Sequence, residues 1–211
     1  MSNPLSSKPT QRPSSEAKRE AIIHAAAQAF FDVGYEAASI EAIAADAGVS
    51  KVTVYNHFGG KPALFSAAVE HECSRMSGAM QIAPDGEGRP IRERLTLLGE
   101  AFHHFVSRPE IMRFDRRIAA ESDRDPTIGD TFMNAGPRPM CIHMAGMIQA
   151  AVDAGELEVE DTMLAAEQFV SMVKGFGEME RRFCGRIDPD RDQDRIEGAV
   201  EVFLRAYGTG K

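Results

Sequence analysis

Residues 39–61 read SIEAIAADAGVSKVTVYNHFGGK, and this stretch decides the fold. Ser39 is a good N-cap for a short helix, because its side-chain oxygen can accept a hydrogen bond from the first turn. The apolar positions of that helix lie on one face: Ile40, Ile43, Ala44 and Ala47. Gly48 follows where a left-handed glycine ends a helix, and Ser50 can cap the next one. The stretch therefore predicts two short helices joined by a tight turn.

The second of these helices, Lys51 to Phe58, has one apolar and one polar face. Val54 and Phe58 are four residues apart and point inward, so the remaining side chains face outward or lie at the edges. Only an element as narrow as a helix fits the major groove of DNA with its side chains at the base edges. The outer face therefore suits DNA, although an ordinary corner between two helices with a solvated polar face gives the same spacing.

Each outward side chain has a chemistry that matches part of a duplex. Lys51 can contact a phosphate or a guanine, Thr53 a phosphate or a thymine methyl, and Asn56 can pair with adenine. Tyr55 and His57 suit phosphates, and Lys61 lies where its ammonium and a helix dipole would act on one phosphate. The predicted DNA-binding residues are Ser39, Ser50, Lys51, Val52, Thr53, Tyr55, Asn56, His57 and Lys61.

Three spaced motifs in residues 19–65 carry a family resemblance. They are F-x-x-x-G-Y from Phe30, I-A-x-x-A-G-V-S from Ile43 and Y-x-H-F-x-x-K from Tyr55. This run resembles the DNA-binding domain of the TetR/AcrR family of bacterial transcription regulators, over about a quarter of the chain. The sequence departs from the family pattern at Val52, where a smaller residue is common, and at Pro62, where an acid is common. Val52 bears on the DNA sequence preference, whereas Pro62 is acceptable in the first turn of a helix.

Composition indicates a globular chain with an acidic body. Of 211 residues, 43% are hydrophobic and 27% are charged, and the net charge is −8. Residues 1–61 hold six Lys and Arg against six Asp and Glu, so the other 150 residues carry the whole acidic excess with 18 against 26. The predicted DNA-binding end is therefore locally neutral, and the acidic body would repel a duplex everywhere except at one face.

Other classes of protein and site are disfavoured by the sequence. No apolar run approaches the length of about 20 residues that a membrane span needs, and the first residues lack the apolar core of a signal peptide. We therefore expect a cytoplasmic protein that does not bind a membrane. The three cysteines, Cys73, Cys141 and Cys184, form no C-x-x-C pair, which predicts reduced and mostly buried thiols. Glu100 and His103 form a single E-x-x-H, which is too common by chance to predict an iron site. We expect no metal and no cofactor.

The chain order predicts an all-α protein with four parts. Residues 1–14 are a disordered tail, 15–61 a three-helix DNA-binding head with Ser15 as its first cap, 62–83 a connecting helix, and 84–211 a helical body for ligand binding and dimerisation. The PDGEGRP run at residues 84–90 marks the boundary before the body. Further helices are predicted over 91–107, 109–122, 125–134, 137–154, 161–184 and 192–207. Residues 121–175 resemble the body of the AefR-like branch of the same family.

The body is rich in methionine and phenylalanine on its apolar faces, which indicates an adaptable interior. A plain core is one interpretation, and a cavity for an apolar or amphipathic ligand between helices is the other. The resemblance favours the cavity, because body domains of this family hold an inducer. The predicted ligand-binding residues are Phe102, Phe105, Met112, Met144, Met147, Phe169 and Met172.

The last two predicted helices each carry an apolar stripe, and the final helix is apolar on more than one side, which suggests a four-helix interface between two copies. The predicted dimer residues are Met172, Phe176, Met179, Ile196, Val200, Phe203 and Tyr207.

Two function classes remain from the sequence. One is a ligand-responsive repressor that binds a palindromic operator as a homodimer and is released by a small effector. The other is a helical small-molecule carrier or enzyme without sequence-specific DNA binding.

Overall fold

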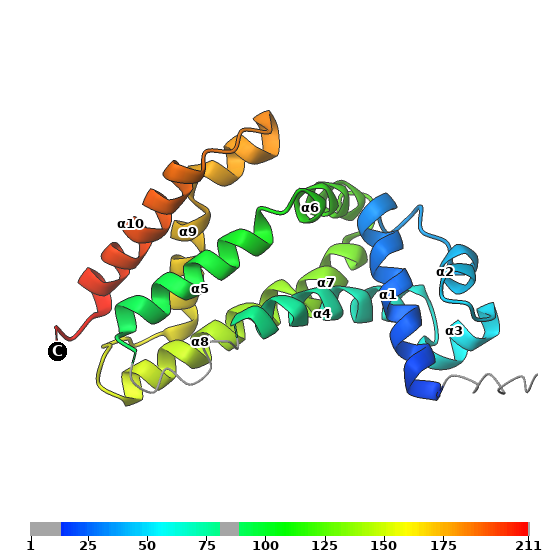
Figure 1. Ribbon diagram of the computed structural model, residues 1–211, viewed down its shortest axis with the longest axis horizontal. Helices are drawn as coiled ribbons and strands as arrows, with labels where there is room; N and C mark the ends of the chain where they lie inside the picture. The colour runs from blue at the N-terminus through cyan, green and yellow to red at the C-terminus, as the bar shows by residue number, and fades with distance from the viewer. Residues whose placement is uncertain (1–13, 81–88, 211) are drawn as a thin grey trace, which may run out of the picture.

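The computed structural model describes residues 14–80 and 89–210 (Figure 1). Within these ranges the regular secondary structure is helical, apart from one isolated bridge between Leu157 and Gly208. Its helices are α1 (Ser15–Val33), α2 (Ile40–Asp46), α3 (Lys51–Phe58), α4 (Lys61–Met80), α5 (Ile91–Val106), α6 (Pro109–Ser122), α7 (Pro126–Ala135), α8 (Pro137–Asp153), α9 (Thr162–Cys184) and α10 (Pro189–Tyr207). Helices α1–α3 form the head at one end of the elongated molecule, and α10 lies at the other end. The predicted all-α fold is confirmed.

Most predicted helix ends are correct, but the cap of α1 and the start of α10 are wrong. Helix α1 is capped by Ser14, whose Oγ accepts a hydrogen bond from the Ala17 amide at 3.1 Å, so Ser15 is its first residue and not its cap. Helix α10 begins three residues before the predicted start, because the Asp188 carboxylate caps it and Pro189 suits its first position. The predicted tail up to residue 13 and the predicted break at residues 84–88 lie outside the described residues.

The first hydrophobic core joins the head to part of the body. It contains the buried faces of α1, α2 and α3, the first part of α4, and residues of α6 and α7 such as Phe114 and Ile128. Aromatic rings connect these parts. The rings of Phe30 and Phe65 meet edge-on with centroids 5.1 Å apart, and the centroids of Phe65 and Phe114 are 6.1 Å apart. The side chain of Val33, at the C-terminal end of α1, is half exposed. The head therefore shares its core with α6 and α7.

The second core is formed by α5, α8, α9 and α10. Helix α8 packs along α9, and α10 packs against both α9 and α5. Phe169 of α9 and Phe203 of α10 meet edge-on, with ring centroids 5.4 Å apart. Asp161 caps α9, and α8 ends shortly before Gly155, whose φ of 72° suits the end of a helix.

Helix α9 contains a break that the sequence analysis did not predict. Gly175 has φ 52° and ψ −161°, a conformation that only glycine adopts readily. The side chain of Arg195 from α10 packs against Gly175, with its Cδ 3.3 Å from the position a Cβ would take. Residues 176–184 consequently run in a new direction, as the orange segment in Figure 1 shows.

Candidate DNA-binding face and effector cavity

The α2–α3 corner has the geometry that its sequence predicts. Ser39 and Ser50 cap the two helices through their side chains, each accepting from an amide three residues on, at 3.0 and 3.1 Å. Gly48 has φ 66°, and the amide of Val49 donates to the carbonyl of Ala44 at 2.9 Å, which closes α2. Because both caps are occupied by backbone amides, Ser39 and Ser50 fix the corner.

Most predicted DNA-binding side chains of α3 lie on one exposed face. Lys51, Tyr55 and Asn56 are exposed, and Val52 is 66% exposed although it is apolar. Thr53 and His57 are half-buried at the edges, and the hydroxyl of Thr53 is hydrogen-bonded to that of Ser50 at 2.9 Å. An exposed valine on a helix that otherwise presents donors offers a methyl-sized apolar contact.

Lys51 is held by a neighbour within the same face. Its ammonium donates to the carboxylate of Glu41 on α2 and lies 5.8 Å from the centre of the Tyr55 ring. The hydrogen bond with Glu41 raises the pKa of Lys51, and the same bond lowers the pKa of Glu41. DNA must therefore compete with Glu41 for this ammonium.

Lys61 lies at the start of α4 and faces the turn after α1. Its Nζ donates to the carbonyl of Glu36 at 3.0 Å and lies 4.8 Å from the centre of the Tyr35 ring. Partial burial lowers the pKa of Lys61. The ammonium thus ties the head to α4, with two of its three donors left for other acceptors.

The turn after α1 is also held from the body, by helix α6. The buried carboxylate of Glu121 accepts hydrogen bonds from the amides of Tyr35 at 2.9 Å and Glu36 at 3.3 Å. Gly34 has φ 90°, and a Cβ there would lie 2.3 Å from Oε1 of Glu121, so this approach requires glycine. One turn earlier on α6, Arg117 donates to the carbonyls of Phe31, at 3.1 Å, and Asp32 at the end of α1. Helix α6 therefore binds the head through both ends of this turn.

A cavity of about 590 Å³ lies between the two cores. Phe31, Val69 and Phe114 line it from the first core, and Phe102, Met140 and Val170 are among the residues that line it from the second. Phe31 of the head stacks on Phe114 of α6, with ring centroids 4.0 Å apart. This volume is in the range that holds a drug-sized molecule.

Three of the predicted ligand-binding residues line this cavity, namely Phe102, Phe105 and Met112. The other four do not. Met144 and Phe169 are buried inside the second core, and Met147 and Met172 pack against that core, because their helices turn these positions toward each other. The sequence analysis missed Phe31, because it lies in the DNA-binding head and its place beside Phe114 depends on how α6 packs against α1.

The cysteines of the cavity are apolar lining. Cys73 and Cys141 both line it as free thiols. Burial raises the pKa of Cys73 to about 11 and also raises the pKa of Cys141, so both stay protonated at neutral pH. Cys184 is exposed, contrary to the expectation of mostly buried cysteines.

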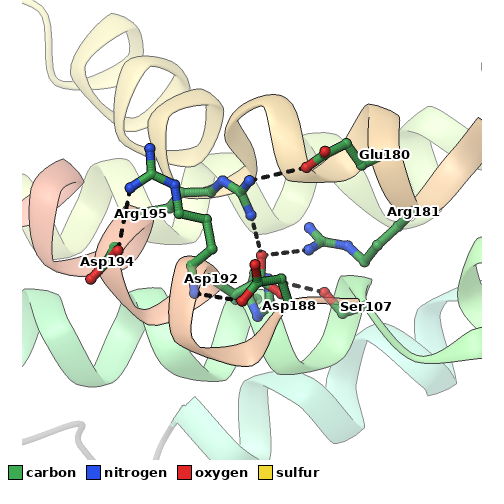
Figure 2. A network of polar contacts seen from close by, with 9 residues as sticks. Ser107, Glu180, Arg181, Asp188, Asp192, Asp194 and Arg195 are labelled. Atoms are coloured by element: carbon green, nitrogen blue, oxygen red, sulfur yellow. Dashed lines mark hydrogen bonds and ion pairs between the residues drawn. The ribbon is translucent and has the colours of Figure 1, made fainter. Parts of the chain in front are cut away.

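One end of the cavity adjoins a buried ion network between α9 and α10 (Figure 2). Asp192 Oδ1 accepts from Arg181 Nη1 at 2.7 Å and from Arg195 Nη1 at 2.6 Å, and Arg195 also reaches Glu180 at 3.2 Å. Burial by itself would raise the pKa of Asp192, but the hydrogen bond and charge of Arg181, helped by His103 and Arg195, hold that pKa below its usual range.

His103 extends this network into α5. Its Nε2 lies 3.6 Å from Asp192 Oδ2 and 3.2 Å from the hydroxyl of Ser107. Burial lowers the pKa of His103, with Asp192 opposing and the two arginines adding to the shift. In the part of the chain that the structure describes, no group of three or more His, Cys, Asp or Glu side chains is arranged to hold a metal ion.

The predicted dimer residues divide into exposed and buried sets. Phe176 and Met179 are 68% and 53% exposed, so they are available to a partner. Ile196, Val200 and Phe203 are buried in the second core, and the prediction that they contact a partner is wrong, because α10 turns this stripe onto α5 and α9. Met172 and Tyr207 are half-buried against the same core. The exposed apolar side of α10 is instead formed by Gly198, Val202 and Ala206.

No helix in residues 14–80 or 89–210 is long and apolar enough to span a bilayer.

Two family models match the chain, and together they account for most of it. The one described as bacterial regulatory proteins of the tetR family matches residues 22–68, which contain the α2–α3 corner. The one described as the AefR-like transcriptional repressor C-terminal domain matches residues 93–209. The predicted resemblance is confirmed for both the head and the body.

Individual relatives are transcription regulators. The chain is 37% identical over 90 residues to the HTH-type transcriptional activator FasR of Mycolicibacterium smegmatis, a match that covers 42% of this chain and only 40% of FasR. A TetR-family regulator from Mesorhizobium loti superposes with a TM-score of 0.79 at 29% identity, over 94% of this chain and 100% of that one. The flavonoid-responsive regulator FrrA superposes with a TM-score of 0.71 at 30% identity, over 93% and 100%. The chain belongs to the TetR family of bacterial transcription regulators, with a helix-turn-helix DNA-binding head and an AefR-like body.

Proposed function

We propose that this regulator is a dimeric repressor that binds a palindromic operator and is released when an apolar or amphipathic molecule occupies the cavity between the two cores. One observation carries the proposal: the cavity is lined by Phe31 of the DNA-binding head together with residues of α4, α6 and α9. The name of the family model for the body, a transcriptional repressor, supports the sign of the response.

Helix α6 supplies the coupling between cavity and head. Ile111, Met112 and Phe114 near its start line the cavity, and Arg117 and Glu121 further along it bind the turn after α1. A ligand that displaces the start of α6 must move these anchors, because a helix transmits displacement along its axis. A ligand that binds the DNA-free arrangement more tightly then weakens DNA binding by linkage.

On DNA, the exposed face of α3 divides into two roles. Lys51, Tyr55 and His57 contact phosphates, as does Lys61 with its remaining donors, and they set affinity. Val52, Thr53 and Asn56 reach base edges, where Val52 matches a thymine methyl and Asn56 matches adenine. The regulator acts in the cytoplasm, where bacterial DNA is found.

The dimer forms through the exposed apolar sides of α9 and α10. Phe176, Met179 and Phe183 are spaced along one side of the segment after the Gly175 break, and all three are at least half exposed. Gly198, Val202 and Ala206 recur every four residues on α10, a row of small side chains that lets a partner helix approach closely. Two copies related by a two-fold axis then present both α3 helices to one side of DNA.

The effector is small and mostly apolar, since apolar side chains, among them five phenylalanines and three methionines, make up most of the cavity lining. FrrA, which shares the fold at 30% identity, is named as flavonoid-responsive, so a related protein responds to a small molecule.

Selection of DNA from random oligonucleotides, followed by fluorescence-anisotropy titration at two salt concentrations, tests the DNA-binding role. We expect a two-fold symmetric consensus and an affinity that falls steeply as salt rises. Binding without sequence preference at every salt concentration would favour the alternative, a helical small-molecule carrier without an operator.

The dimer is tested by placing a charge on its proposed surface and weighing the protein by light scattering. Val202→Glu and Phe176→Glu should give folded monomers with strongly reduced operator affinity. Ile142→Glu is the matched control, because Ile142 is equally exposed but lies on α8. A wild-type protein that is monomeric at micromolar concentration, with and without operator, would contradict the dimer.

A further inference from the structure

The cavity has a buried cation in its wall. Arg181 is only 3% exposed. It lines the large cavity and also a second, smaller cavity of about 360 Å³ beside His103. A guanidinium removed from water is costly unless it is paired, so a residue of this kind is retained for structure or for a ligand.

The hydrogen bond to Asp192 uses only one of the N–H donors of Arg181. A guanidinium carries five N–H groups, and the hydrogen bond at 2.7 Å to Asp192 uses one on Nη1. The same carboxylate oxygen also accepts from Arg195 Nη1 at 2.6 Å. Asp192 would therefore keep a cationic partner if Arg181 also bound a second acid.

The backbone of α9 is shaped to allow this arrangement. A Cβ on Gly177 would lie 2.4 Å from Arg195 Nη1 and 3.1 Å from Asp192 Oδ1, so the absence of a side chain lets Arg195 reach Asp192. Arg181 lies six residues after the break at Gly175, and Figure 2 shows its guanidinium directed at the carboxylate of Asp192.

The other charged residues of the cavity are poorer ligand anchors. Lys174 pairs with Glu178 at 3.4 Å and Arg182 with Asp115 at 3.6 Å, and all four side chains are at least one third exposed. Glu167 and Arg138 are exposed as well. Water already solvates these groups, so they would bind a charged ligand weakly, whereas Arg181 is buried. The remaining charged residue of the lining, Glu72, is only 13% exposed and pairs with Arg108 at 3.2 Å, and as an acid it offers no anchor for an anion.

We propose that the effector is an amphipathic acid whose carboxylate binds the guanidinium of Arg181 while its apolar part lies against the phenylalanines of the cavity. The inference rests on the proposed effector-responsive function and names the chemical class of the effector. An arginine fork matches a carboxylate with two parallel hydrogen bonds, and the apolar lining on the other side accepts a chain or ring.

Calorimetric titration of the full-length protein with three probes of equal chain length tests the charge of the ligand. Decanoate should bind about ten- to a hundredfold more tightly than decanol, the gain typical of a charge-assisted hydrogen bond. Decylamine, which is cationic at neutral pH, should bind most weakly. Equal binding of decanoate and decanol, tighter binding of decylamine, or no binding of decanoate would overturn the proposal.

Substitutions locate the anchor. Arg181→Gln should remove the preference for decanoate over decanol and leave decanol binding unchanged, whereas Arg182→Gln, on the adjacent residue of the same lining, should keep the preference. If Arg181→Gln does not fold, the double variant Arg181→Gln, Asp192→Asn removes both charges of the pair and tests the same point. Retention of the full preference in a folded variant without the Arg181 charge would overturn the proposal.

Operator binding separates this inference from the proposed function. Release of DNA by decanoate and decanol alike would refute the acid anchor and support effector control. Selective binding of decanoate through Arg181 with unchanged DNA affinity would support the anchor and refute effector control.

Discussion

The two hydrophobic cores are held together by different chemistry. The first, which joins the head to α6 and α7, is connected by stacked and edge-on rings such as Phe31 on Phe114 and Phe30 on Phe65. The second, which contains the helices proposed to form the dimer, also has an edge-on ring pair, Phe169 and Phe203, but adds a buried ion network around Asp192. The cavity lies between them. We propose that a ligand there changes how the core that bears the head sits against the second core, without unfolding either.

This difference predicts that removal of a carboxylate lowers the free energy of unfolding most in the second core. Asp192→Ala leaves Arg181 buried without its acid, and we expect the free energy of unfolding to fall by about 3–5 kcal/mol at fixed protein concentration. Asp194→Ala is the control, since its pair with Arg191 at 3.3 Å is exposed and should contribute less than about 1 kcal/mol. Denaturant titration measures both, and equal effects would mean that the network contributes no more than a surface pair.

In the first core the corresponding carboxylate is Glu121. Glu121→Ala removes the acceptor for the amides of Tyr35 and Glu36, so we expect a loss of about 2 kcal/mol of stability and a weaker affinity for DNA, because the turn between α1 and α2 loses its anchor. Glu36→Ala is the control, because it removes only the exposed pair with Arg124 at 3.1 Å. Unchanged DNA affinity in a folded Glu121→Ala protein would show that α6 does not position the head.

The second core should also respond to mild acid through His103. Burial lowers the pKa of His103 below its ordinary value of about 6.5, so the unfolded chain takes up this proton before the folded chain does. Stability is therefore lost as the pH falls below about 6.5 toward the folded pKa, and none is lost through His103 above that range. His103→Asn should flatten this part of the stability profile, whereas His104→Asn, at the exposed neighbour, should not. A steep profile that survives His103→Asn would show that the loss of stability does not come from His103.

The smallest predicted effect lies on the DNA-binding face. Glu41→Gln releases the ammonium of Lys51 and removes a negative charge beside the duplex, so affinity for every sequence should rise about two- to fivefold, with a salt slope steeper by up to about one. Anisotropy titration over a salt series measures both quantities. An unchanged slope would indicate that Lys51 does not reach a phosphate.

The head was predictable because its structure follows from local signals. Ser39, Gly48 and Ser50 each determine a helix end through a hydrogen bond or a backbone conformation within a few residues. The amphipathic spacing of α3 placed Val54 in the core correctly. Local chemistry of this kind can be deduced from the order of residues alone.

The body was less predictable because packing decides which side of a helix is covered. Periodicity identified the stripe of Ile196, Val200 and Phe203 but not that α5 and α9 bury it within one chain. In the same way, residue type selected Met144 and Phe169 for a cavity although the adjoining helix fills their space. Glu121 and its partner Tyr35 are 86 residues apart in the chain, and helical periodicity carries no information about contacts at that separation.

The central claim is that occupation of the space between the two cores weakens DNA binding, and a cavity-filling variant tests it without a ligand. Val170 lines the cavity from α9, so Val170→Trp places a permanent side chain in that space. We expect a folded dimer whose operator affinity is at least about tenfold lower, while Ile142→Trp, on the exposed surface of α8, binds as the wild type does. A folded Val170→Trp dimer that fills the cavity and binds the operator with wild-type affinity would contradict the account.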